Sequence, residues 1–181
     1  MLRHGRSEYV VLRRTIAQRG ALRHILFVVG IGIWAAVLTA VLVWLPYPLA
    51  FLIPLLTLLA AFETIRPLHF GAERIGRYLQ VFYEETGEPE RPLHDTPSWE
   101  RVAMRFGAVP GVGGHPLFLP VFVLATAVNF MAAIHHRPGF LDHILLAIIH
   151  AGCGAWMLST HGAMKKQREI ELNRMRHLRD Q

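Results

Sequence analysis

The chain has 181 residues, of which 52% are hydrophobic and 18% charged, and its formal net charge is +6 at pH 7. A single cysteine, Cys153, excludes an intrachain disulfide framework. The positive charge does not indicate nucleic-acid binding, because the basic residues flank uncharged apolar runs, where contact with anionic lipid headgroups accounts for them.

Four apolar runs without a charged residue divide the chain. They are Ile25 to Leu45, Pro46 to Phe62, Pro116 to Ile134 and Ile144 to Thr160. A helix needs about 20 apolar residues to cross the roughly 30 Å hydrocarbon core of a bilayer. The first and third runs meet this length, and interfacial anchoring by Trp44, Tyr47 and Arg66 extends the shorter second run.

We therefore expect an all-α polytopic membrane protein with four transmembrane helices in two hairpins. The predicted segments are a basic N-terminal segment (1–23), hairpin 1 (24–63), a cytoplasmic or interfacial loop (64–114), hairpin 2 (115–160) and a helical cytoplasmic tail (161–181). Of the 19 Lys and Arg residues, only Arg137 lies on the outer side of this arrangement. The positive-inside rule thus places both termini in the cytoplasm of a multi-pass protein of the cell (inner) membrane.

Prolines predict the turns of the hairpins. Trp44 to Pro48 predicts the first turn and His135 to Gly139 the second, because proline restricts the residue before it and lacks a backbone donor. Pro54, inside the second run, predicts a kink in that helix.

The loop between the hairpins is long enough to carry structure of its own. Apolar residues at helical spacing between Phe70 and Glu85 predict an amphipathic helix at the level of the headgroups. Thr96 and Pro97 indicate the start of a second, short helix. These helices either cap the bundle or form a docking platform for a partner or for lipid.

A few polar residues lie inside the apolar runs. The five expected near the middle of the membrane are Thr39, Thr57, Thr126, Asn129 and His150. We expect them to form a hydrogen-bonded layer across the bundle, in which each interhelical bond contributes about 0.6 to 2 kcal/mol.

His150 is open to three interpretations, since an ionisable residue inside the membrane is by default a candidate functional residue. The favoured one is a neutral histidine that is hydrogen-bonded within the bundle. The second is ligation of haem or a metal ion, which would need a second ligand from another subunit. The third is a proton relay. The sequence therefore leaves the cofactor unknown.

A weaker hypothesis concerns the outer end of the second hairpin, where four potential ligands are close in sequence. They are His135, His136, Asp142 and His143. They could hold a transition metal if the hairpin folded them together, but adjacent histidines on a helix point apart.

Small residues at four-residue spacing indicate close helix packing. One stripe comprises Gly32, Ala36 and Ala40, and the other comprises Ala147, Ala151, Ala155 and Ser159. They could seal the bundle internally, which we favour, or contact a helix of another protein.

The tail from Lys165 to Arg179 is predicted to be a solvated helix. Arg168 with Glu171, and Glu171 with Arg174, would form ion pairs along it.

No catalytic motif is present in the sequence, so we do not expect an enzyme. The favoured function is that of an accessory or assembly subunit of a membrane complex. Its partners would be lipid, anionic headgroups and other membrane subunits or a second copy, but not nucleic acid. The alternatives are a haem- or metal-binding electron-transfer subunit that uses His150, and a small oligomeric transporter or channel.

Overall fold

The computed structural model describes residues 2–45, 47–85 and 117–181. Within these ranges the chain is helical, with no strand. The short helix predicted at Thr96 lies outside the described residues, as does most of the predicted loop.

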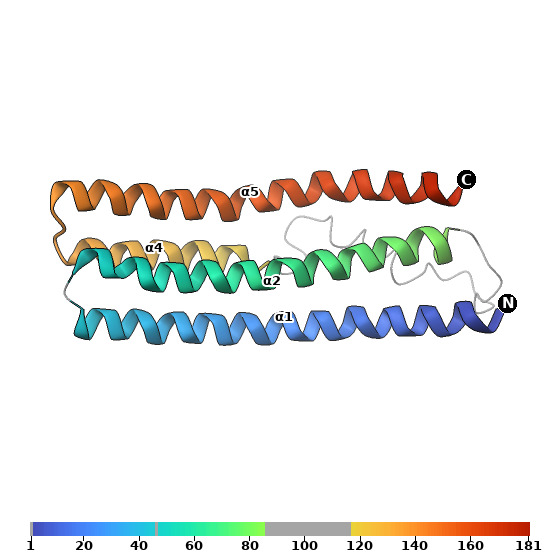
Figure 1. Ribbon diagram of the computed structural model, residues 1–181, viewed down its shortest axis with the longest axis horizontal. Helices are drawn as coiled ribbons and strands as arrows, with labels where there is room; N and C mark the ends of the chain where they lie inside the picture. Colours follow the sequence, from blue (N-terminus) through green and yellow to red (C-terminus); the bar gives the residue numbers. More distant parts are fainter. Residues whose placement is uncertain (1, 46, 86–116) are drawn as a thin grey trace. The chain divides into compact units, whose positions relative to one another are not determined.

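The helices follow one another along the chain as shown in Figure 1. They are α1 (Leu2–Trp44), the 3-10 helix η1 (Pro48–Phe51), α2 (Leu52–Leu79), the π-helix η2 (Gln80–Glu84), α4 (Leu119–His135) and α5 (Phe140–Arg179). Both predicted turns are confirmed, because α1 ends at Trp44 and α4 ends at His135. Past α4, Arg137 adopts the left-handed conformation (φ 51°), which stops the helix.

Three of the helices are longer than the apolar runs. The basic N-terminal segment is part of α1, and the tail is part of α5. The amphipathic helix predicted from Phe70 is not a separate element, because α2 continues unbroken to Leu79 and then passes into η2. The sequence between Phe62 and Leu79 holds one proline, Pro67, which the helix accommodates.

The predicted role of Pro54 needs correction. Pro54 lies in the first turn of α2. Backbone N–H groups in the first turn have no acceptor within the helix, so the N–H that proline lacks costs no helical hydrogen bond. Pro54 therefore marks the start of the helix and does not interrupt it.

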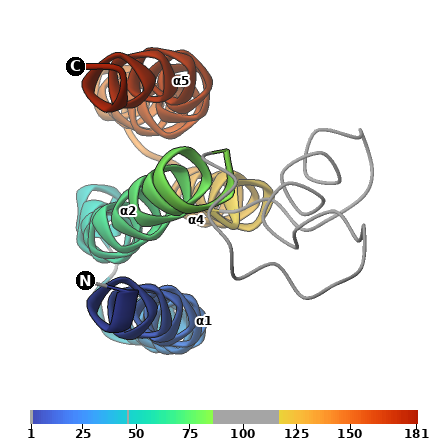
Figure 2. The ribbon, with the colours of Figure 1, turned by 90° about the vertical axis from the view of Figure 1, so that its right-hand side faces the viewer.

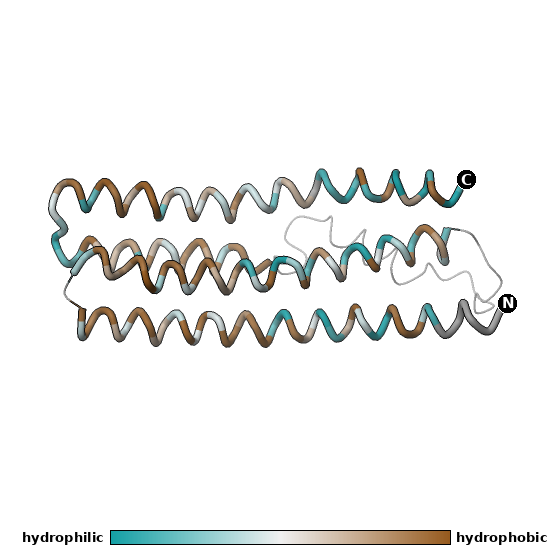
Figure 3. Tube along the Cα trace, viewed as in Figure 1, coloured by the Kyte–Doolittle hydropathy of each residue, from teal (hydrophilic) through white to brown (hydrophobic). Residues whose placement is uncertain are grey.

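The chain folds into two compact units. The first, which we call the apolar unit, comprises Leu22–Pro67 and His115–Ala163. The second, the polar unit, comprises Met1–Ala21, Leu68–Gly114 and Met164–Gln181. Figure 3 shows mainly apolar segments in the first and many hydrophilic positions in the second.

The apolar unit has hydrophobic side chains both inside and outside. Phe51, Phe62 and Phe122 are completely buried, and Phe122 packs edge-on against Phe62 and Phe27. Large apolar side chains on its surface include Val28 (67% exposed) and Leu56 (66% exposed). Extensive exposed apolar surface marks contact with a membrane or with another protein.

Three helices, α1, α2 and α5, are long and apolar enough to cross a membrane. The fourth, α4, is also apolar but has only 17 residues. The structure thus supports an all-helical protein with helices compatible with membrane spans.

The close approach of α1 to α2 occurs at Gly30. A Cβ atom added there would lie 2.7 Å from the Cβ of Ala61, whereas one added at Gly32 would meet nothing within 4 Å. Gly30 shares its face of α1 with the buried residues Trp34, Leu38 and Val41.

These two glycines offer a matched pair of substitutions. We expect Gly30→Ala to destabilise the protein by about 1 kcal/mol, because overpacking outweighs the gain in helix propensity. Gly32→Ala gains the same propensity without the clash, so it should leave the melting temperature in detergent unchanged or raise it. Equal melting temperatures for the two variants would contradict the α1–α2 contact.

In the polar unit α2 lies between α1 and α5 (Figure 2), and its side chains bond to both. On one side, Tyr78 and Tyr83 donate hydrogen bonds to the two carboxylate oxygens of Glu8, at 3.3 and 2.7 Å. The π-helix makes this possible, because its i to i+5 bonding brings residues five apart to one face.

Candidate functional site

Two polar sites join helices that are distant in sequence. One is a buried amide and imidazole in the apolar unit. The other is a charged cluster in the polar unit, which no sequence pattern predicted.

Asn129 and His150 form the site in the apolar unit. Asn129 on α4 is completely buried, and His150 on α5 is 4% exposed. The Asn129 amide nitrogen lies 2.9 Å from His150 Nε2 and donates a second hydrogen bond, also of 2.9 Å, to the carbonyl oxygen of Phe51. His150 Nδ1 lies 2.7 Å from the carbonyl oxygen of Leu146. The site thus joins α4 to α5 and to η1.

These contacts fit one protonation state of the ring. A carbonyl oxygen only accepts, so Nδ1 of His150 carries a proton and donates it to Leu146. The Asn129 amide nitrogen only donates, so Nε2 of His150 is the unprotonated acceptor. His150 is therefore neutral in this arrangement, and both of its ring nitrogens have partners within the chain.

The three threonines of the predicted layer do not join this site. Each hydroxyl donates to a carbonyl one turn back on its own helix: Thr39 to Ala35, Thr57 to Ile53 and Thr126 to Phe122. Thr126 is buried, whereas Thr39 is exposed. Of the five residues predicted to form the layer, Asn129 and His150 are the ones whose hydrogen bonds join different helices.

The four residues of the predicted outer metal site are not brought together. His136 contacts the Phe51 ring, with centroids 5.0 Å apart, and His143 lies edge-on to Phe130. Within the described ranges no three His, Cys, Asp or Glu side chains form a group suited to a metal ion.

The small-residue stripes lie mostly on the surface of the apolar unit. Gly32 and Ala36 are exposed on α1, and Ala40 is half-buried. On α5 the exposed members are Ala151, Ala155 and Ser159, with Ala147 half-buried. The internal packing that we favoured for them is instead made by Gly30 on α1 and by Leu146, His150 and Met157 on α5.

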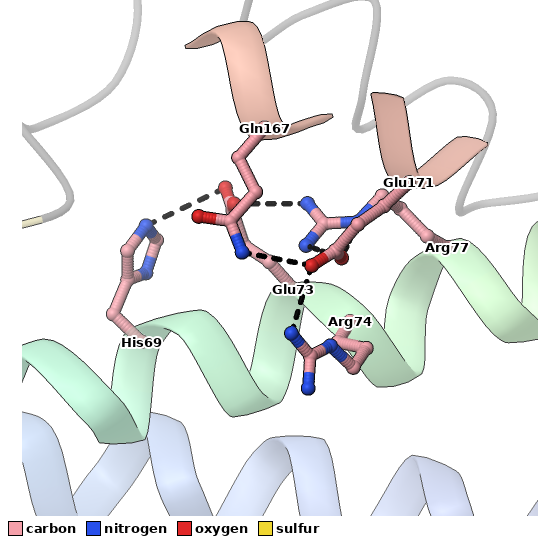
Figure 4. A network of polar contacts seen from close by, with 6 residues as sticks. All are labelled: His69, Glu73, Arg74, Arg77, Gln167 and Glu171. Atoms are coloured by element: carbon pink, nitrogen blue, oxygen red, sulfur yellow. Dashed lines mark hydrogen bonds and ion pairs between the residues drawn. The ribbon is translucent and has the colours of Figure 1, made fainter. Parts of the chain in front are cut away.

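Arg77 is the centre of the charged cluster in the polar unit (Figure 4), which comprises His69, Glu73, Arg74, Arg77, Gln167 and Glu171. The Arg77 side chain is only 2% exposed. Its guanidinium contacts Glu171 on α5 at 2.6 Å and Glu73, one turn back on α2, at 3.1 Å. Burial of a charge is tolerated only when it is paired and hydrogen-bonded, as it is here.

Glu171 receives three donors and so links α5 to α2. Besides Arg77, it accepts bonds from Arg74 at 2.8 Å and from Gln167 at 2.9 Å. The prediction that Glu171 pairs with Arg168 and Arg174 along the tail was wrong. Glu171 pairs with α2 and not along its own helix because this pairing neutralises the buried guanidinium of Arg77.

The donors lower the pKa of the Glu171 carboxyl to about 2, with the hydrogen bond from Arg74 as the largest cause. Burial alone would raise the pKa of Glu73, but its partners His69 and Arg77 outweigh that effect and lower it. A second link joins α5 to the end of η2, since Arg176 and Arg179 on α5 contact Glu85, the residue after η2, at 2.8 and 3.0 Å. The hydrogen bond from Arg176 is the main cause that lowers the pKa of Glu85.

These pKa shifts predict acid sensitivity of the polar unit. A carboxyl whose pKa is lower in the folded state stabilises the fold at pH values above its ordinary pKa, 4.5 here, and loses that contribution as the pH falls toward the folded value. We expect hydrogen-exchange protection of residues 164–179, corrected for intrinsic rates, to fall between about pH 4.5 and pH 2. Protection that is constant across this range would contradict the Glu171 links.

Comparison of the chain with protein-family models, with curated proteins and with solved structures finds no match.

Proposed function

We propose that the protein is a multi-pass membrane protein with four spans and cytoplasmic termini that acts as an accessory or assembly subunit of a membrane complex. The exposed apolar surface of the apolar unit supports lipid as its surroundings. The distribution of Lys and Arg supports the orientation.

The short helix α4 is compatible with a span. Its buried residues include Phe122, Ala125 and Asn129, so other helices surround much of it. A span slightly shorter than the hydrocarbon core is tolerated through local thinning or flanking residues, at a cost of fractions of a kcal/mol per Å.

The state of His150 is the observation that favours interaction over the alternatives. Haem ligation requires a free ring nitrogen, whereas both nitrogens of His150 have partners at 2.7 and 2.9 Å. A proton relay requires partners that gain and lose protons, and neither the Asn129 amide nor the Leu146 carbonyl does so. The hydrogen bonds give this residue a structural role between α4 and α5.

The small residues on the surface of the apolar unit favour a protein partner. Ala151, Ala155 and Ser159 are exposed on α5, and exposed small residues allow a second helix to approach closely. Contact with lipid does not require small residues at this spacing, whereas close contact with a helix of another subunit does.

Photocrosslinking in native membranes tests this proposal. A photoreactive residue at Ala155 should form an adduct with another membrane protein, and Ala155→Phe should reduce the amount of that protein that co-purifies in mild detergent. Leu158→Phe is the matched control, because Leu158 is a large exposed residue of the same helix (55% exposed).

An Ala155 adduct with lipid alone would contradict the interaction function. An absorption spectrum of the purified protein tests the alternative of a haem-binding electron-transfer subunit. A haem band that disappears in His150→Phe would establish a cofactor site. Ion or solute flux in liposomes that is lost in the same variant would favour the transporter.

A further inference from the structure

The outward face of α5 in the polar unit carries cations around one exposed apolar residue. The face comprises Lys166, Ile170, Arg174 and His177, which we call the tail face. Residues spaced by three, four and eight positions share one side of a helix, and all four side chains are exposed. Ile170 is 66% exposed.

Two carboxylates of the polar unit are paired away from this face. Glu171 and Glu85 are turned toward the interior, where they bind Arg74, Arg77, Arg176 and Arg179. Among the described residues, no polar partner contacts Lys166 or Arg174. Glu169 is exposed at the edge of the tail face beside Lys166, so the face around Ile170 keeps the cations Lys166 and Arg174 with one carboxylate at its border.

From this charge distribution we infer that the tail face binds an acidic amphipathic helix of a partner protein, an inference that rests on the proposed interaction function. An apolar residue of the partner would cover Ile170, and Asp or Glu residues one turn to either side would meet Lys166 and Arg174. Such helix pairing by an apolar contact flanked by complementary charges is a common recognition mode.

A second copy of this chain does not fit the tail face. A two-fold interface places the same patch of each subunit against the other. Lys166 and Arg174 would then meet the same cations of the second copy, whichever way the two helices ran.

Lipid headgroups do not account for Arg174 and His177, the half of the tail face that lies further along the helix from Thr160. Arg174 follows Thr160, the end of the proposed fourth span, by 14 residues, which a helix extends to about 21 Å. Attraction to anionic headgroups fades within a Debye length of roughly 8 Å. Arg174 and His177 are therefore placed to meet a protein.

A binding experiment with a defined probe tests the inference. The full chain, in nanodiscs of zwitterionic phosphatidylcholine, is titrated with a synthetic helical peptide that has a leucine stripe flanked by glutamates. We expect binding that weakens about tenfold in Arg174→Glu and in Ile170→Ser. The matched controls on α1 are Arg14→Glu and Val10→Ser, since both side chains are exposed and Val10 (59%) resembles Ile170.

The inference is overturned if the peptide fails to bind, or if the α1 controls weaken binding as much as the α5 variants do. Crosslinking in native membranes provides the second measurement. A photoreactive residue at Ile170 should join an acidic segment of a protein, and Arg174→Glu should abolish this adduct. Adducts of Ile170 only with lipid or with this chain itself overturn the inference.

The Ala155 crosslink separates the two proposals. An adduct at Ala155 without one at Ile170 leaves the proposed function intact and overturns only the tail face. Absence of a protein adduct at both positions overturns both.

Discussion

Glu171→Gln should destabilise the packing of α5 on α2 by on the order of 3 kcal/mol, because it leaves the buried guanidinium of Arg77 with one carboxylate where it had two. The substitution keeps the shape of the side chain, so the loss is one of charge. Hydrogen exchange of residues 164–179 at neutral pH measures it as a decrease in the free energy of local opening.

Glu169→Gln is the control for this prediction. Glu169 lies two positions earlier on the same helix and is exposed. We expect a change within about 0.5 kcal/mol, as for most surface substitutions. If both variants behaved alike, the Arg77 cluster would not be the contact that secures α5 in the polar unit.

Asn129→Leu should lower the stability of the apolar unit by about 2 kcal/mol. It removes two hydrogen bonds, to Phe51 and to His150, each worth about 0.6 to 2 kcal/mol between helices. His150→Phe should cost less, because the bond from Asn129 to Phe51 survives. Thermal melting in detergent measures both effects.

The double variant Asn129→Leu/His150→Phe and the single variant Thr57→Val provide two controls for these melting temperatures. The double variant should be less destabilised than the sum of the single variants, because they share one hydrogen bond. Thr57→Val should change the melting temperature little, since the Thr57 hydroxyl bonds only to its own helix. Additive effects of the two single substitutions would show that Asn129 and His150 are not coupled.

The sequence allowed prediction of the elements whose causes are local. Proline positions located both turns, and uninterrupted apolar composition predicted the helices. The sequence predicted that Asn129 and His150 belong to one polar layer, but not that they pair with each other. The depth of a residue along a helix does not determine which side chains point toward one another. Asn129 and His150 face inward, whereas Thr39 does not.

Contacts between distant segments were beyond the reach of the sequence. Glu171 had plausible partners on its own helix, and nothing local indicated that Arg77, more than ninety positions earlier, would compete for it. The helical pattern did not indicate it either, because at 100° per residue Arg77 falls on the side of the helix opposite the apolar residues Ile75, Leu79 and Phe82. The stripe that contains Gly32 was expected to pack inside the bundle but is mostly exposed, because spacing alone does not show which face of a helix is buried.

Both proposals depend on the four-span membrane topology, and labelling of single cysteines probes that topology. In a Cys153→Ser background, Arg137→Cys and Gln181→Cys are each treated with a membrane-impermeant maleimide on intact cells. We predict that the cysteine at position 137 is labelled from outside and that the cysteine at position 181 is labelled only after the membrane is permeabilised. Labelling of both positions from the same side would contradict the four-span arrangement.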